Sequence, residues 1–261
     1  MWIFPLGAGV VSAVFASLLG RQWLARRRPH QIAWTVALLM FAVATVATAQ
    51  GVRLGWTPAL FRTYYLFGAM VNVPFLAVGT VYLLAPRRAG HLFAGLAVLA
   101  AGLGTVALLS AHLDVRALDL RGIPEASLVI TGRALPRTLS RYYSYTAFGI
   151  VVLGALWSAR RLSRHSRSLG GRGAEGSGGL AASSEDLRRL ASGNVLIAAG
   201  TFVVAAASVA VRLGRGPSVA VIFSTGLLAG ITTMFAGFLR TRSRPERSAA
   251  GRAAPAAISP A

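Results

Sequence analysis

The side chain with the clearest chemical potential in this sequence is an asparagine in the middle of an apolar stretch. Asn72 stands two residues before Pro74 within Tyr64–Leu84, a segment without any charged residue. A buried amide needs hydrogen-bond partners, and proline removes a backbone N–H and kinks a helix, which frees a carbonyl group. The pair therefore predicts either a polar binding site at mid-helix or a hydrogen bond to a neighbouring helix, which is the more common use of such an asparagine.

Other polar positions extend this candidate site. Asn72 belongs to a face whose members recur every three or four residues: Tyr65, Gly68, Asn72, Phe75, Gly79 and Tyr82. Thr201 and Ser224 lie in two later stretches that also carry stripes of small and polar residues, and such stripes mainly serve as helix-packing seams. The candidate ligand-binding residues are Tyr65, Asn72, Pro74, Thr201 and Ser224, with helix packing as the alternative.

Most enzyme chemistry is excluded by residue type. The chain has no cysteine and no lysine, which removes thiolate metal sites and a retinal Schiff base. It contains neither a G-x-S-x-G nor an H-E-x-x-H motif. Among the four histidines only His30 and His91 could meet as a pair of haem ligands, and interfacial side chains are the simpler explanation. We expect no catalytic residue, no metal and no cofactor, and therefore a protein that is not an enzyme.

The elements that position these residues follow from composition. Of 261 residues, 55% are hydrophobic and only 13% are charged, whereas soluble domains carry about 25% charged residues. Seven stretches approach the roughly 20 apolar residues that a membrane helix needs: 3–19, 32–49, 64–84, 92–111, 142–159, 195–211 and 219–239. The fifth is the weakest, because its strictly apolar run covers only Ala147–Trp157. We predict an all-α polytopic membrane protein whose seven-helix domain spans residues 1–240.

The arginines orient these helices, because loops on the cytoplasmic side carry the excess of positive charge. With the N-terminus outside, 18 of the 27 arginines lie on the inner side. Arginines follow the first apolar stretch instead of preceding it, which is typical of a retained helix and not of a cleaved signal peptide. We expect an N-out, C-in arrangement as a multi-pass protein of the cytoplasmic (plasma) membrane.

Three segments lie between or beyond the spans. We expect an extracellular loop over residues 112–141, long enough for a lid or hairpin but not for a domain. Residues 160–190 form an Arg/Gly/Ser-rich cytoplasmic loop with a flexible linker over Leu169–Ala182 and a helix that starts at Ser183. Residues 241–261 read as a disordered tail. The basic inner segments fit anionic lipid and not nucleic acid, because no base-stacking aromatic residues are interleaved with the arginines.

One sequence word occurs twice. V-R-L-G-x-x-P starts at Val52 after the second stretch and again at Val211 after the sixth, 159 residues later. Spans 1–3 and 5–7 would then be parallel halves joined by span 4, a known construction of transporters with the binding site at the midplane.

This 3+1+3 order resembles the SWEET sugar facilitators. In that family an asparagine on span 3 lines the sugar site, and Asn72 matches it. The Pro-Gln loop motif of the family is missing, and span 7 has Ser224 and Thr225 where the family has asparagine. The chain more closely resembles uncharacterised seven-span integral membrane proteins of high-GC actinobacteria. That resemblance rests on the segments 61–62, 64–69, 72–74, 76–81, 135–137, 193–198 and 235–239.

Two functions follow as hypotheses. The first is a facilitator-type carrier or binder of a small uncharged or weakly anionic molecule, with its midplane site on span 3. The alternative is a non-transporting membrane scaffold or sensor subunit that acts through protein partners. A small-molecule ligand and a homo-oligomer or membrane partner are the partners to test, besides anionic lipid at the cytoplasmic face.

Overall fold

A computed structural model describes residues 1–118, 122–132, 135–170, 177–213 and 217–241, and this part of the chain is helical apart from one two-stranded ladder. The long helices are α1 (Ile3–Arg26), α2 (Pro29–Leu54), α4 (Asn72–Leu84), α5 (Arg87–Leu109), α8 (Leu135–Gly170), α9 (Ser177–Leu213) and α10 (Pro217–Thr241). The short elements are α3 (Pro58–Tyr64), the π-helix η1 (Tyr65–Val71), α6 (Val115–Leu118), α7 (Ala126–Val129), β1 (His112–Leu113) and β2 (Ile130–Thr131). The all-helical prediction is confirmed for the described residues.

Six helical segments within the described chain are long and apolar enough to cross a membrane. They are 3–26, 29–54, 58–84, 87–109, 191–211 and 218–241, and each overlaps one of the expected spans. The expected fifth span, 142–159, lies in the continuous helix α8 but is not among the six. Its weakness follows from the sequence, because the polar stretch Tyr142–Thr146 forms part of that expected span.

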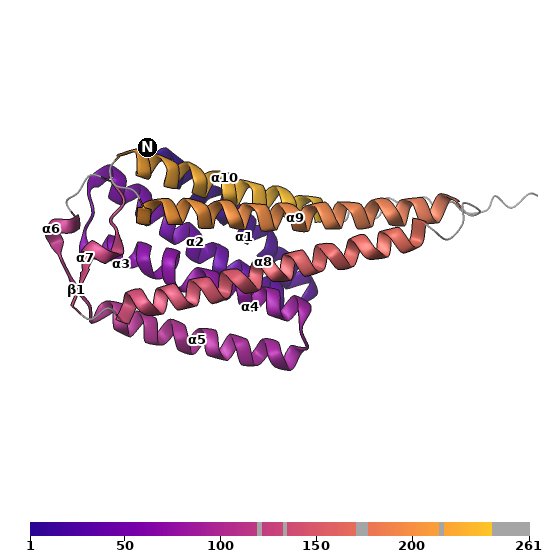
Figure 1. The fold of residues 1–261 in the computed structure, drawn as a ribbon, viewed down its shortest axis with the longest axis horizontal. Helices are drawn as coiled ribbons and strands as arrows, with labels where there is room; N and C mark the ends of the chain where they lie inside the picture. The colour runs from indigo at the N-terminus through magenta and orange to yellow at the C-terminus, as the bar shows by residue number, and fades with distance from the viewer. Residues whose placement is uncertain (119–121, 133–134, 171–176, 214–216, 242–261) are drawn as a thin grey trace, which may run out of the picture.

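The long helices pack side by side in a closed order (Figure 1). α1 packs on α2, α2 on α4, α4 on α8, α8 on α9, α9 on α10, and α10 returns to α1. α5 lies outside this ring against α4 and η1, and its leucines Leu92, Leu96 and Leu99 are exposed. Six long helices of the described chain therefore form this ring, and α5, which connects α4 to α8, packs on its outside.

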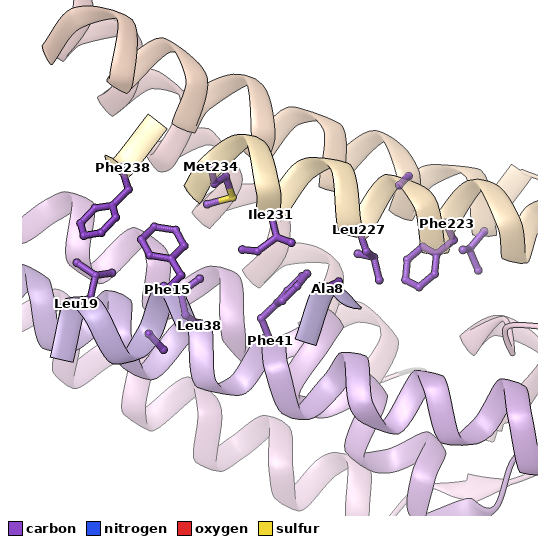
Figure 2. Packing of buried hydrophobic residues seen from close by; sticks show 13 residues of the cluster. Ala8, Phe15, Leu19, Leu38, Phe41, Phe223, Leu227, Ile231, Met234 and Phe238 are labelled. Carbon is purple, nitrogen blue, oxygen red and sulfur yellow. The ribbon is translucent and has the colours of Figure 1, made fainter. Parts of the chain in front are cut away.

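The core consists mainly of two apolar clusters. The larger one joins α1, α2, α9 and α10 (Figure 2), where Phe15 of α1 lies between Phe235 and Phe238 of α10 at ring-centroid distances of 5.3 and 4.8 Å. The second cluster joins η1, α5 and the segment between α5 and α8, with Phe61 and Met70 fully buried. The first cluster thus holds α1, α2, α9 and α10 together, and the second holds span 3 against α5 and the connection that follows it.

The connection between α5 and α8 folds as a small cap. β1 and β2 pair in antiparallel register, with His112 opposite Thr131 and Leu113 opposite Ile130. Leu118 and Val129 of this connection are 1% and 0% exposed, because they pack on the ends of α3 and α5. We call residues 111–132 the cap; residues 119–121 lie outside the described part.

Parts of two expected loops are helical. α8 begins at Leu135, within the loop expected over 112–141, and this part of α8 packs on η1. The loop expected over 160–190 is mostly helical: α8 continues to Gly170, and α9 begins at Ser177, six residues before the predicted start at Ser183. Arginine, leucine and alanine favour helix, and the two helices extend together beyond the rest of the bundle (Figure 1). The tail from residue 242 lies outside the described residues.

Candidate functional site

The third apolar segment changes its helical pattern next to Pro74. It begins as the α-helix α3, continues as the seven-residue π-helix η1 over Tyr65–Val71, and returns to α-helix at Asn72. Proline cannot donate a backbone hydrogen bond, and its ring collides with the carbonyl four residues earlier in a regular α-helix. The wider π pattern, in which hydrogen bonds join residues five apart, relieves that collision. The π-helix thus lies directly before the first turn of α4, which contains Pro74.

The carbonyl group of Ala69 lies five residues before Pro74. In a π pattern its donor would be the amide of residue 74, which a proline lacks. The hydroxyl groups of Ser140 and Ser144, one turn apart on α8, donate to the Ala69 oxygen at 2.9 and 2.7 Å. Ser140 is 2% exposed. These serines therefore supply two side-chain donors to a backbone carbonyl that Pro74 cannot serve.

Asn72 and Pro74 are both buried directly after the π-helix. Asn72 is 4% exposed, and its side-chain amide makes no hydrogen bond to the described part of the chain. An amide has two donor hydrogens and one acceptor oxygen, so Asn72 retains its full hydrogen-bonding capacity at this depth. This side chain is the strongest binding candidate in the structure.

The other candidate residues lie on separate elements. Tyr65 stacks on Phe61 at 5.7 Å and belongs to the cluster beneath the cap. Thr201 of α9 donates to the Ile197 carbonyl of its own helix at 2.8 Å. Ser224 of α10 is 1% exposed, and its hydroxyl has no hydrogen-bond partner among the described residues. Ser224 is thus the candidate residue with a fully buried polar atom that has no partner among the described residues.

The residues of the predicted face of span 3 contact two different helices, α2 and α5. Gly68 approaches Ala44 of α2, and Gly79 lies directly against the Trp34 ring of α2. The Trp34 indole donates to the Leu76 carbonyl at 3.1 Å. Tyr82 instead bonds His91 of α5, with 2.9 Å between its hydroxyl and Nδ1. The glycines therefore serve close packing on α2, as the alternative interpretation of this face holds.

The two histidines considered as a haem pair have other partners. His30 packs edge-on against Trp34 at 5.3 Å, and His91 packs on Tyr82 at 5.4 Å in addition to its hydrogen bond. Among the described residues, no group of three or more histidine or acidic side chains could hold a metal ion. These contacts assign both histidines to the packing of the helix ends.

The cap is fastened above the candidate site by side chains of the α2–α3 corner. The Trp56 indole donates to the Gly122 carbonyl at 2.7 Å, and the Arg62 guanidinium donates to the Ala111 carbonyl at 3.2 Å. Trp56 also contacts the Tyr64 ring at 5.4 Å. Tyr64 in turn meets Phe223 of α10 edge-to-face, with 6.3 Å between centroids and 88° between planes. A chain of contacts therefore connects the cap with α3 and α10.

Sequence reasoning missed Ser140 and Ser144 as partners of span 3. It placed Ser140 in the outer loop and used Ser144 only to lengthen span 5. Their spacing of four residues, which puts two hydroxyl groups on one helix face, is the signal that could have identified them. No family model matches the chain, and neither a curated protein nor a solved structure is similar to it at a significant level.

Proposed function

We propose that the chain is a seven-span protein of the plasma membrane, N-out and C-in, built from two similar three-helix halves. The halves are α1 to α4 and α8 to α10, and α5 joins them. The repeated word supports this, because its two copies coincide with the same helix boundaries. α2 ends at Leu54 and α3 begins at Pro58, while α9 ends at Leu213 and α10 begins at Pro217.

Helix contacts recur in the two halves. Gly79 packs on Trp34 in the first half, and Gly237 packs on Gly193 in the second, where a β-carbon on Gly237 would lie 2.6 Å from the Gly193 carbonyl oxygen. Trp34 and Gly193 are 159 positions apart, the spacing of the repeated word, and Gly79 and Gly237 are 158 apart. Paired contacts at equivalent positions are what a duplicated unit produces.

A second pair of glycines repeats the pattern in part. Gly68 packs on Ala44 in the first half, whereas Gly226 packs on Ala207 in the second, with the Val203 carbonyl oxygen 4.0 Å from its built β-carbon. The spacing from Ala44 to Val203 is 159, and the spacing from Gly68 to Gly226 is 158. The single-residue difference falls between Tyr64 and Gly68, where the π-helix begins. Since a π-helix holds more residues per turn than an α-helix, it accommodates this extra residue of span 3.

The first and fifth helices fit the same relation. Gly20 of α1 lies 3.7 Å, measured from a built β-carbon, from the Thr35 methyl group of α2. Asn194 of α9, which is 159 positions after Thr35, donates to the Ser158 hydroxyl of α8 at 2.9 Å. The equivalent of α1 is therefore α8, which supports its role as the fifth span.

This construction favours a facilitator-type carrier or binder of a small uncharged or weakly anionic molecule. Transporters made of parallel repeats bind their substrate near the midplane between the halves, often where a helix is interrupted. The observation that carries the proposal is the buried Asn72 amide, which has no hydrogen bond among the described residues and follows the π-helix at the contact with α8. Thr201 and Ser224 are the second-half residues that would complete the site.

Native mass spectrometry of the gently solubilised protein tests the carrier. We expect a discrete small-molecule adduct that is lost in Asn72→Leu and retained in Thr105→Val. Thr105 is a matched control because its hydroxyl bonds only within α5, to the Ala101 carbonyl at 2.7 Å. An adduct that survives Asn72→Leu would reject the site, and a protein that carries only bulk lipid would reject the carrier.

A scaffold or sensor subunit is the second candidate. The observation that favours it is the paired extension of α8 and α9, helices of 36 and 37 residues, past the ends of the other helices (Figure 1). Deletion of residues 169–182 separates the two functions. A scaffold should lose a co-purifying subunit in the deletion variant, whereas a carrier should keep its small-molecule adduct.

A further inference from the structure

The ring contact between Tyr64 and Phe223 has a special place in the two-half arrangement. The residues are 159 positions apart, which is the spacing of the repeated word. In any assembly of two units related by a twofold axis, a residue that touches its own equivalent lies on that axis. Tyr64 and Phe223 therefore mark the point where the axis between the halves passes through the end of the bundle that carries the cap.

Further apolar groups cover this point. Trp56 packs edge-on against Tyr64 and is fixed to the cap by its hydrogen bond to the Gly122 carbonyl. Ile123, the next residue of the cap, packs on the same apolar cluster as Tyr64, Phe223 and Val219. The axis is thus closed at this end by two rings from opposite halves and by the cap, which contacts both.

We infer that Tyr64 and Phe223 form the outer gate of a pathway along this axis. Trp56 and the cap residues Gly122 and Ile123 hold this gate closed. The inference rests on the proposed carrier and adds the end of the bundle at which its binding site opens. Carriers built of repeats expose the site by rocking one half against the other, and such rocking separates residues that face each other across the axis. The gate is closed in this structure. Tyr64 and Phe223 meet edge-to-face across the axis, and Trp56, which packs on Tyr64, donates one hydrogen bond to the cap.

The absence of cysteine from the sequence makes the gate directly testable. Asn72→Cys supplies a reporter thiol at the candidate site, and its labelling rate by a membrane-impermeant maleimide is measured in intact cells and, separately, in inside-out vesicles. We expect slow labelling in the reporter background. Tyr64→Ala with Phe223→Ala should raise the rate at least tenfold from the side that carries the cap, and from that side alone.

Two controls exclude general loosening of the bundle. Tyr82→Ala with His91→Ala removes a ring pair of similar size that lies away from the axis, and it should leave the labelling rate unchanged. Tyr64→Phe keeps the ring and should label as slowly as the reporter alone. Trp56→Phe, which keeps an aromatic ring but loses the hydrogen bond to the cap, should give an intermediate rate.

The outcomes separate the gate from the carrier. An unchanged rate in the Tyr64→Ala, Phe223→Ala variant, or an equal rise in the Tyr82→Ala, His91→Ala control, overturns the gate. If the small-molecule adduct is nevertheless present and lost in Asn72→Leu, the carrier stands and its site opens elsewhere. If the gate variant labels quickly but no adduct is ever found, the axis is an accessible pathway and the carrier proposal fails on its own test.

Discussion

The Ser144 hydroxyl donates a 2.7 Å hydrogen bond to the backbone carbonyl of Ala69, which belongs to a different long helical segment. Ser140 donates to the same oxygen one turn earlier on α8. Both bonds lie where Pro74 has no amide hydrogen to offer the Ala69 carbonyl. Two hydroxyl groups of α8, the least apolar long helix, therefore attach it to the segment that contains the π-helix by donating to one backbone carbonyl.

Removal of both hydroxyl groups should be more harmful than the sum of the single changes. Ser140→Ala or Ser144→Ala alone leaves one donor on the Ala69 oxygen, so each should lower the free energy of unfolding by at most about 1 kcal/mol. The double variant leaves a buried carbonyl without a partner, which should cost about 1–3 kcal/mol more. Thermal or denaturant unfolding of the solubilised protein measures both. Ser17→Ala is the control, because its exposed hydroxyl bonds only within α1; strictly additive losses would contradict the shared role.

Pro74→Ala should make the two serines dispensable. Alanine supplies the missing N–H to the Ala69 or Met70 carbonyl, and the local helix can then return to the α pattern. In the Pro74→Ala background we expect Ser140→Ala with Ser144→Ala to cost less than about 1 kcal/mol. The double-mutant cycle is read from the same unfolding curves. A loss as large as in the wild-type background would mean that the two serines do not replace an amide hydrogen that Pro74 lacks.

The helical class and most helix positions follow from hydropathy, because long apolar runs without charged residues leave few alternatives. The effect of Pro74 on its helix was predicted only in part. Sequence alone indicates that a carbonyl is freed, but the partners of that carbonyl lie about 70 residues away on another helix, and tertiary packing selects them. The loop expected over 160–190 was placed from its charge and glycine content, whereas the structure continues α8 through Gly170.

The candidate site was predicted with similar limits. Asn72 is as deeply buried as expected, since a lone amide in an apolar segment has to face other helices. Tyr65 belongs to the cluster beneath the cap, because the π-helix changes the rotation per residue between Tyr65 and Asn72, and the regular spacing used for the face does not hold there. The contact of Tyr64 with Phe223 could not be predicted, because it depends on how α3 and α10, more than 150 residues apart in the sequence, pack in the bundle.

Two glycines with opposite surroundings should respond oppositely to alanine. A β-carbon on Gly79 would collide with the Trp34 ring and displace its indole from the Leu76 carbonyl, so Gly79→Ala should cost about 1–3 kcal/mol. Gly95 of α5 has no atom within 4 Å of its built β-carbon, and alanine is the better helix former by up to about 1 kcal/mol. Gly95→Ala should therefore be neutral or stabilising. Unfolding midpoints of the two variants check this, and equal destabilisation would contradict the assigned packing of α2 on α4.

Loss of the Trp56 hydrogen bond should loosen the cap without unfolding the bundle. Trp56→Phe keeps an aromatic ring beside Tyr64 but removes the donor to the Gly122 carbonyl, a loss of about 0.5–1.5 kcal/mol of local stability. Amide hydrogen exchange at Asp114, whose N–H donates to the Val129 carbonyl at 2.9 Å, should then accelerate about two- to tenfold, because this amide exchanges through local opening of the cap. Exchange in α2 and α10 should stay unchanged, and so should cap exchange in Trp157→Phe, whose ring is 68% exposed on α8. Acceleration that spread equally to α2 and α10 would mean that Trp56 stabilises the whole bundle, and that the cap does not open as a separate unit.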